Sequence, residues 1–157
     1  MPSELEHFLR EQGSQAELLA LPVEVSTVEA AAEAVGTTAD KIVKSVLFMV
    51  DGQPVLAIAS GARRIDRRRI AQRFAVGRKQ VRLADEFQVQ SATGYPVGSV
   101  PPFGHPEPLL TIIDPGVLEH DVVFAGGGAR DHLIKVETEE IQRISQGEIL
   151  ELIDRSE

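Results

Sequence analysis

Apolar residues recur along the chain in short runs separated by glycine, proline and charged residues. The clearest run covers residues 42–50, where β-branched and large apolar side chains predominate. Asp51 and Gly52 follow it with the residue pair typical of a tight hairpin turn, and a second apolar run covers 54–59. The pattern therefore predicts a β-hairpin over 42–59.

Two further stretches have the composition of helices. Residues 27–35 are rich in alanine and glutamate and precede Gly36, a typical helix terminator. Asp66 is placed to cap a helix that runs to residue 74. We also expect a first helix that ends before Gly13 and a last one that opens at Thr138. Shorter elements are expected at 23–25, 81, 85–89, 109–113, 122–124 and 133–136.

The segment from Gly94 to Pro108 is so dense in glycine and proline that regular structure is excluded there. A long irregular loop in a chain of 157 residues is frequently functional. The mixture of helices and strands predicts a mixed α/β (α+β) fold. We expect one domain over 1–157, because a chain of this size can bury a core of its own.

The composition is that of a packed protein, with 43% apolar and 25% charged residues, which argues against disordered, collagen-like and coiled-coil classes. No apolar run approaches the roughly 20 residues of a membrane helix, and the charged first residues carry no export signal. The sequence has no cysteine, which excludes disulfides, a thiolate nucleophile and a Cys-based zinc site. We therefore expect a cytoplasmic protein without membrane contact.

The charge is unevenly distributed. The net charge is −8, yet nine of the sixteen basic residues fall between Arg63 and Arg82. Such a run is either the solvated face of a helix and its flanks or a contact for phosphate, and the sequence leaves both readings open. If the run contacts a nucleic acid, binding should weaken steeply as salt rises.

Several classes of site are excluded by missing motifs: no serine nucleophile elbow, no phosphate-binding P-loop and no zinc helix occurs. The glycines at 126–128 lack the last glycine of a dinucleotide fingerprint and predict a tight bend, whose amides could also face a ligand. The four histidines lack metal-ligand spacing, so we expect no metal, and we place most of them at the surface.

Lys44 is unusual because it interrupts an apolar strand. On a period of two it shares a side with Val46 and Phe48, so its ammonium lies on an apolar side unless a cleft opens there. A desolvated lysine is costly and is usually kept for a charge partner, a substrate or catalysis. The alternative is a lysine near a strand end that reaches solvent.

Residues 41–48 and residues 93–104 both resemble segments of one family, the YbaK/ProX aminoacyl-tRNA deacylases. Residues 41–48 are similar to the strand that carries the functional lysine of that family, with Ser45 at the position usually held by threonine. Residues 93–104 are similar to its glycine and proline loop, from which Ser99 and Pro101 depart by replacing glycine and serine.

A third similarity covers residues 111–114 and 123–136, so that the resemblance extends over about 38–144. It implies a curved, barrel-like mixed sheet flanked by helices, a pocket for the aminoacyl-adenosine end of tRNA, ester hydrolysis and no cofactor. It also implies a free-standing relative of the editing domain of prolyl-tRNA synthetase, acting in trans. Cysteine or alanine on the tRNA for proline is the leading substrate, and an aminoacyl-tRNA synthetase is a possible partner of a monomeric protein.

Taken together, the residues and the resemblance place catalytic roles on Lys44, Gly98 and Ser99. Amides near 98–100 would hold the ester carbonyl and orient water, while Lys44 would grip the terminal phosphate or the developing oxyanion. We expect no covalent intermediate. Substrate contacts are expected from Ser45, Thr93, Gly94, Tyr95, Val100, Pro102, Gly104, Asp114, Gly128 and His132.

Alternatives remain open for some of these residues and for the function. Tyr95 either stacks on adenine or packs in the core, and Asp114 either orients Lys44 or serves as an Asp-Pro turn residue. The departures at Ser99 and Pro101 also fit a non-catalytic module that binds a nucleotide or a tRNA synthetase.

Overall fold

The computed structural model describes residues 2–25 and 27–154, with backbone only at residues 2 and 3. The helices are α1 (Pro2–Glu11), α2 (Val28–Val35), α3 (Arg67–Phe74), α4 (Glu86–Thr93) and α5 (Thr138–Ser145), with short 3-10 turns η1 (Ala39–Lys41), η2 (Arg78–Gln80) and η3 (Pro115–Glu119). The strands are β1 (Glu17–Ala20), β2 (Val43–Val50), β3 (Gln53–Ser60), β4 (Val81–Leu83), β5 (Leu110–Ile113), β6 (Val122–Gly126), β7 (His132–Glu137) and β8 (Glu148–Ile149).

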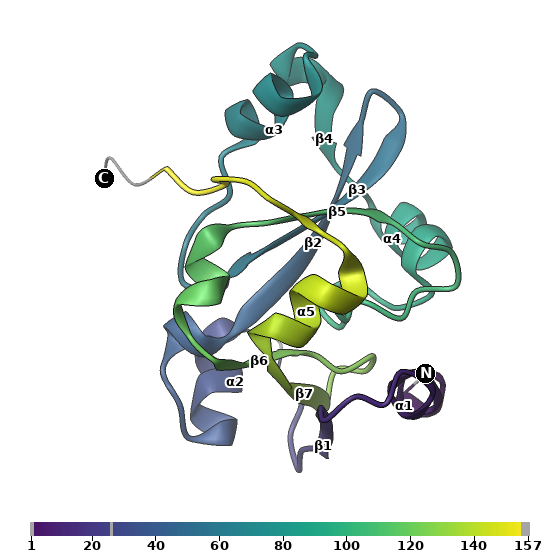
Figure 1. Ribbon diagram of the computed structural model, residues 1–157, viewed down its shortest axis with the longest axis vertical. Helices are drawn as coiled ribbons and strands as arrows, with labels where there is room; N and C mark the ends of the chain where they lie inside the picture. Colours follow the sequence, from purple (N-terminus) through teal and green to yellow (C-terminus); the bar gives the residue numbers. More distant parts are fainter. Residues whose placement is uncertain (1, 26, 155–157) are drawn as a thin grey trace.

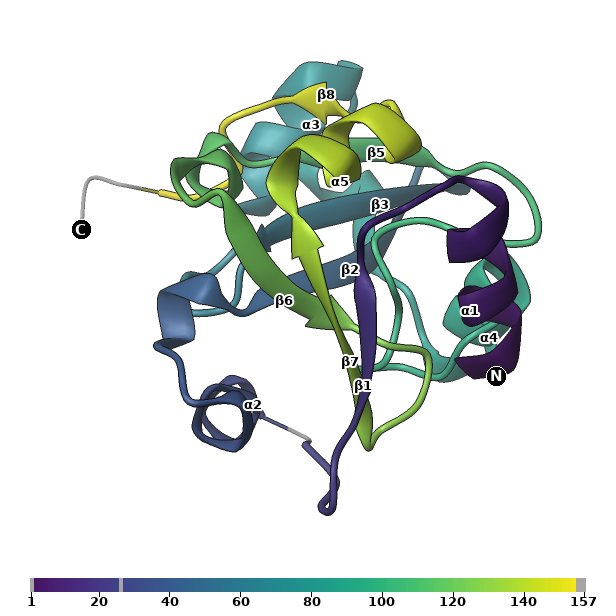
Figure 2. The same ribbon diagram turned by 60° about the horizontal axis from the view of Figure 1, so that its bottom comes forward.

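The strands form two sheets, as Figures 1 and 2 show. The larger has the order β4-β2-β3-β5-β8, in which β2 and β3 are antiparallel while β3 and β5 are parallel. The smaller is antiparallel with the order β1-β7-β6, and a bridge from Ile42 to Phe124 joins it to the larger sheet. The predicted mixed α/β fold is confirmed.

The predicted hairpin is confirmed in β2 and β3. Its register pairs Val50 with Gln53, which leaves Asp51 and Gly52 as the two-residue turn. Both turn residues have positive φ, 48° and 83°, as the favoured type of two-residue hairpin turn requires.

Side chains of β2 alternate between two cores. Val43 and Leu47 pack in the main core, which both sheets share. Phe48 and Val50 pack on the other face, in a second core that α3 covers. Because successive residues of a strand face opposite sides, Lys44 lies on the side of Phe48 and Ser45 on the side of Leu47.

Two predicted helices begin and end where the sequence indicates. The Thr27 hydroxyl accepts a hydrogen bond from the Ala30 amide at the start of α2, and Gly36 ends that helix in the left-handed conformation. Asp66 caps α3 by accepting from the Arg68 amide. Figure 1 shows α3 beside β4 at one end of the molecule, remote from α2.

The predicted strand at 23–25 is wrong. The strand of this region is β1, which pairs with β7 along its four residues. Downstream of β1, the Leu21 and Val25 amides bond to single carbonyls of the turn between β6 and β7, and Val23 is 56% exposed. The short strand β8 was not predicted, since it depends on pairing with the distant β5.

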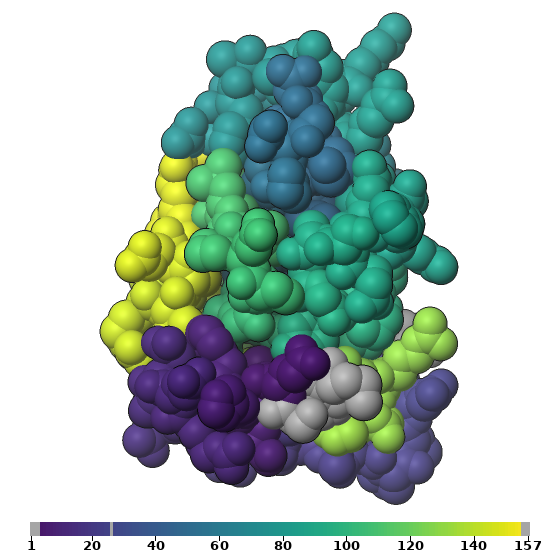
Figure 3. Space-filling view, turned by 90° about the vertical axis from the view of Figure 1, so that its right-hand side faces the viewer, coloured from purple at the N-terminus to yellow at the C-terminus, as the bar shows by residue number. Residues whose placement is uncertain are grey.

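The segment after α1 is attached to α5. The buried Glu140 carboxylate accepts hydrogen bonds from the Ser14 hydroxyl, at 2.6 Å, and from the Gln15 amide, at 3.1 Å. Figure 3 shows the N-terminal segment in purple against the C-terminal part in yellow. Within residues 2–25 and 27–154, no helix is long and apolar enough to cross a bilayer.

Candidate functional site

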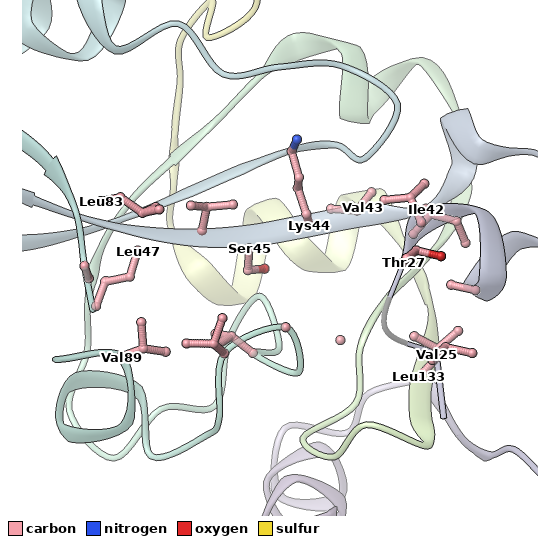
Figure 4. Close-up of a pocket in the computed structure, with 18 residues that line it drawn as sticks. Val25, Thr27, Ile42, Val43, Lys44, Ser45, Leu47, Leu83, Val89 and Leu133 are labelled. Atoms are coloured by element: carbon pink, nitrogen blue, oxygen red, sulfur yellow. The ribbon is translucent and has the colours of Figure 1, made fainter. Parts of the chain in front are cut away.

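A cavity of about 350 Å³ lies along β2 (Figure 4). Its walls are mostly apolar and come from α2, β2, β4, α4, the loop after α4 and the ends of β6 and β7. Four of the predicted site residues line this cavity: Lys44, Ser45, Gly98 and Val100.

Lys44 and Ser45 point to opposite faces of β2, as Figure 4 shows. The Lys44 ammonium turns away from the Ser45 side and donates a hydrogen bond of 2.6 Å to the Arg63 carbonyl oxygen. Burial, and then the positive charge of Arg64, lower the pKa of Lys44 below its ordinary value. The ammonium is thus held at the edge of the cavity, next to other cations.

The Ser45 hydroxyl is a buried polar group without a partner. Among the described residues, none lies within hydrogen-bond distance of its Oγ. Leaving such a group unsatisfied costs about 1–3 kcal/mol, which a hydrogen bond from a bound ligand would offset. Ser45 therefore brings a buried, unsatisfied hydroxyl to the wall of the apolar cavity.

A tight turn in the loop after α4 closes one side of the cavity. The Ser99 amide donates to the Pro96 carbonyl at 3.1 Å, and Gly98 has φ of 85°, which the third position of such a turn requires. Within the described chain, the amides of Gly98 and Val100 donate to no other group. Both residues line the cavity, so these two amides are candidates for a ligand contact.

The role predicted for Ser99 needs correction. Its amide is already used within the turn, and its side chain is only 1% exposed and lies outside the cavity lining. The Ser99 carbonyl accepts from the Gly128 amide at 2.9 Å. Ser99, predicted to be catalytic, and Gly128, predicted to contact substrate, therefore hold the loop in place.

Gly126, at the end of β6, permits close packing of the loop on the smaller sheet. A Cβ atom at this position would lie 2.3 Å from the Val100 carbonyl oxygen, much closer than real atoms approach. The late glycines thus form the support of the loop, which agrees with the tight bend predicted for them.

Three more predicted contacts lie away from the cavity. The Thr93 hydroxyl is fully buried, donates to the Val89 carbonyl at 2.7 Å and accepts from the Tyr95 amide at 3.1 Å. Gly94 ends α4 in the left-handed conformation. Tyr95 is 2% exposed and packs in the main core. The suggested stacking of Tyr95 on adenine is wrong, because other side chains cover its ring.

The other predicted contacts are also separate from this cavity. Pro102 and Gly104 line a smaller cavity of about 210 Å³ next to α1 and α5. Asp114 accepts from the Gly116 amide at 2.9 Å and from the Leu152 amide at 2.8 Å, in agreement with the turn alternative. His132 forms a 2.7 Å hydrogen bond with Asp131.

The histidines are less exposed than expected. His105 is largely enclosed, and its Nε2 lies 2.8 Å from the Pro101 carbonyl oxygen. Burial lowers the pKa of His105. In the described parts of the chain, no three histidine or acidic side chains come together as a metal site would require.

Sequence reasoning missed the contribution of α2. Thr27, Val28 and Ala31 line the cavity opposite β2, together with Val25 and Leu133. The signal for α2 was present as a helix-forming composition, but no local pattern indicates which loop or strand this helix faces.

The cavity can bind and orient a ligand, and Lys44, whose ammonium turns away from the Ser45 side, is the one titratable group in its described lining. Thr27, Lys44 and Ser45 are the polar side chains among its described lining residues, and no carboxylate, imidazole or thiol is among them. Backbone amides and a hydroxyl that face an apolar cavity are suited to hold a carbonyl oxygen as it gains negative charge.

Comparisons with known proteins agree on one family. The sequence model described as the aminoacyl-tRNA editing domain matches residues 23–144. The chain is 34% identical over 122 residues to a proline–tRNA ligase of Maridesulfovibrio salexigens, which is 78% of this chain but only 18% of the ligase. It is 29% identical over 131 residues to the multifunctional Ser/Thr-tRNA deacylase ProXp-y of Escherichia coli K12, with 80% of this chain and 77% of that protein covered.

A solved structure is similar over nearly the full length. It is described as a proposed trans-editing enzyme for prolyl tRNA synthetase, and it superposes with a TM-score of 0.90 at 27% sequence identity. The superposition covers 98% of this chain and 96% of that chain.

Proposed function

We propose that this chain, which belongs to the aminoacyl-tRNA editing domain family, is an aminoacyl-tRNA deacylase that acts in trans to remove wrongly attached small amino acids. The similarity to a proposed trans-editing enzyme over 96% of that chain supports action in trans. A cytoplasmic location, where charged tRNA is found, is part of this proposal.

The observation that carries the proposal is the cavity beside β2. It has a volume of about 350 Å³, which accommodates a small aminoacyl group together with part of the ribose. The aminoacyl group lies against Ser45, whose hydroxyl has no partner among the described residues. The ester carbonyl faces the amides of Gly98 and Val100.

Lys44 binds the phosphate of the terminal nucleotide rather than the oxyanion that forms at the ester carbonyl. Its ammonium points to the face of β2 opposite Ser45 and lies next to Arg63 and Arg64. A cation there is suited to the phosphate of the terminal nucleotide, which leaves the carbonyl to the backbone amides. Of the two roles predicted for Lys44, the geometry favours the first.

The reaction is hydrolysis by water without a covalent intermediate. Water attacks the ester carbonyl carbon, the bond to the ribose oxygen breaks, and the proton lost by water passes to that leaving oxygen. Because Lys44, the one titratable group in the described cavity lining, points to the face of β2 opposite Ser45, a hydroxyl or amino group of the substrate relays the proton. The protein contributes orientation and charge stabilisation.

Cysteine or alanine on the tRNA for proline remains our leading substrate. The apolar walls accept a side chain of this size, and a small polar group would reach Ser45. The relative from Escherichia coli carries serine and threonine in its name, so both belong in the test.

The experiment measures hydrolysis of a panel of aminoacyl-tRNAs by wild type, Lys44→Ala and the control Lys135→Ala. The panel carries cysteine, alanine, serine and threonine on the tRNAs for proline, alanine and threonine. We expect wild type to hydrolyse at least one ester, and Lys44→Ala to lose at least about tenfold in kcat/KM through a charged hydrogen bond. Lys135, exposed on β7, should be replaceable without effect. The proposal would be refuted if the wild-type protein hydrolysed none of the esters faster than buffer alone.

A further inference from the structure

The chain concentrates positive charge in one segment of an acidic protein. Residues 61–82 carry nine of the sixteen basic residues and one acidic residue, Asp66, although the net charge of the chain is −8. The structure gathers five of these nine side chains around one open cleft of about 730 Å³, between the start of α3, η2 and the C-terminal segment. The arginines that line this arginine cleft are Arg63, Arg64, Arg67, Arg68 and Arg78.

Four of these five arginines have no carboxylate partner among the described residues. Arg68 pairs with Asp66 at 3.0 Å and with Asp154 at 3.6 Å. In the part of the chain that the structure describes, no carboxylate lies within 4 Å of the guanidinium groups of the other four. All five arginines are exposed. Arg67 is positioned over the ring of Phe48, 5.9 Å from its centroid. Unpaired cations at this density repel one another unless an anion joins them.

The arginine cleft adjoins the proposed aminoacyl cavity. Lys44 lines the cavity, and its ammonium bonds to the carbonyl of Arg63, which lines the cleft. Gly61 donates to the Ile42 carbonyl, and a Cβ there would lie 2.6 Å from Val28, so Gly61 packs on the cavity wall one residue before the cleft begins.

We propose that the arginine cleft binds the phosphate backbone of the tRNA acceptor strand next to the terminal adenosine. This inference rests on the proposed function and extends it to the residues that hold the tRNA itself. The cleft is open, and its guanidinium groups are spread over a loop, a helix start and a 3-10 turn. This spread suits successive phosphates of a strand better than one small anion, and arginine pairs with phosphate through two parallel hydrogen bonds.

The first test uses fluorescence anisotropy to measure binding of an RNA hairpin that ends in the CCA acceptor sequence and carries no amino acid. The variant Arg64→Gln/Arg78→Gln removes two cleft charges. The matched control, Lys79→Gln/Arg82→Gln, removes two charges from the same segment at positions outside the cleft lining. We expect the Kd to rise at least about tenfold in the cleft variant. The slope of log Kd against log salt concentration should also fall by roughly 0.7–0.9 for each phosphate that is no longer neutralised. The control should stay within about twofold of wild type.

The second test separates the cleft from the chemistry. Hydrolysis of aminoacyl-adenosine, which has no upstream phosphate, is compared with hydrolysis of the full aminoacyl-tRNA. The cleft variant should lose at least about fivefold more kcat/KM on the tRNA than on the short ester. Equal losses on both, or equal Kd values for the cleft and control variants, would overturn the inference.

Binding and hydrolysis fail in different ways. If wild type binds the hairpin through the cleft but hydrolyses no ester, the proposed function fails while the cleft assignment stands. If inorganic phosphate at about 1 mM displaces the hairpin fully, the cleft is a site for a free anion and not for an RNA strand. A thermal melt of each variant confirms that these exposed substitutions leave the fold intact.

Discussion

Lys44 and Ser45 are neighbours in the chain that serve two different surfaces. The strand directs the ammonium toward Arg63 and the hydroxyl toward the cavity. The sequence showed that Lys44 interrupts an apolar strand, and the family resemblance predicted that this lysine is functional. Neither indicated that the Ser99 amide is used by Pro96, because that depends on the turn actually adopted. The assignment of individual amides therefore required coordinates.

Replacement of Ser45 by alanine should separate stability from function. Its hydroxyl has no partner among the described residues, so Ser45→Ala should keep the free energy of unfolding or raise it by up to about 1 kcal/mol. The same change should lower kcat/KM for the preferred aminoacyl-tRNA. Urea unfolding and deacylation rates test this, with exposed Ser91→Ala as control. A clear loss of stability in Ser45→Ala would show that the hydroxyl has a structural partner.

The titration of Lys44 should respond to Arg64. Burial and the Arg64 charge lower the pKa of Lys44, so Arg64→Gln should raise that pKa while leaving it below the ordinary lysine value of 10.5. Because the protonated form binds phosphate, binding through Lys44 is lost as pH rises through this lowered pKa. NMR titration of the lysine side chains in both proteins measures the shift. An unchanged Lys44 pKa in the variant would mean that the two charges do not interact.

At the scale of elements, local sequence signals predicted the helices that are bounded by a capping residue and the strands that are joined by a two-residue turn. The hairpin of β2 and β3, the helix α2 and the Asp66-capped helix α3 are of this kind. β1 and β8 were misplaced or missed, because each exists only by pairing with a strand far away in sequence. The same limit hid the packing of α2 against the cavity.

The contact between β6 and the loop after α4 should tolerate no side chain. In Gly126→Ala the added Cβ would meet the Val100 carbonyl oxygen, so the loop must move, at a cost of about 1–3 kcal/mol in the free energy of unfolding. The displaced amides of Gly98 and Val100 should also lower kcat. The control Gly77→Ala adds a Cβ 3.0 Å from the flexible Gln80 side chain and should do neither. Wild-type kcat in Gly126→Ala would argue against the role of these amides.

At the scale of the whole molecule, composition and the resemblance indicated the class of fold and family, and the structure and comparisons confirm both. The cavity is assembled from segments between residues 25 and 133, which no single motif spans. The distribution of arginines was visible in the sequence, but its meaning was open. The structure shows that five of the nine basic residues between Arg63 and Arg82 surround one cleft, while Arg73 pairs with Glu148 instead.

One long-range polar contact should matter for the entire fold. Glu140→Ala leaves the Ser14 hydroxyl and the Gln15 amide without their acceptor, so we expect the free energy of unfolding to fall by about 1–3 kcal/mol. The neighbouring Glu139 is exposed and pairs with Arg143, so Glu139→Ala should change stability by less than about 0.5 kcal/mol. Urea denaturation of both variants tests the difference. Equal stabilities would show that the N-terminal segment contributes little here.

Lys44 and Ser45 are adjacent and point to opposite faces of β2, so the strand fixes the spacing between them. One peptide unit separates the group proposed to bind phosphate from the group proposed to contact the aminoacyl side chain, and a paired strand advances by a fixed distance of about 3.3 Å per residue. No loop movement can change that spacing. In the proposed function, β2 therefore selects substrates by the distance between their terminal phosphate and their aminoacyl group, whatever the loops do.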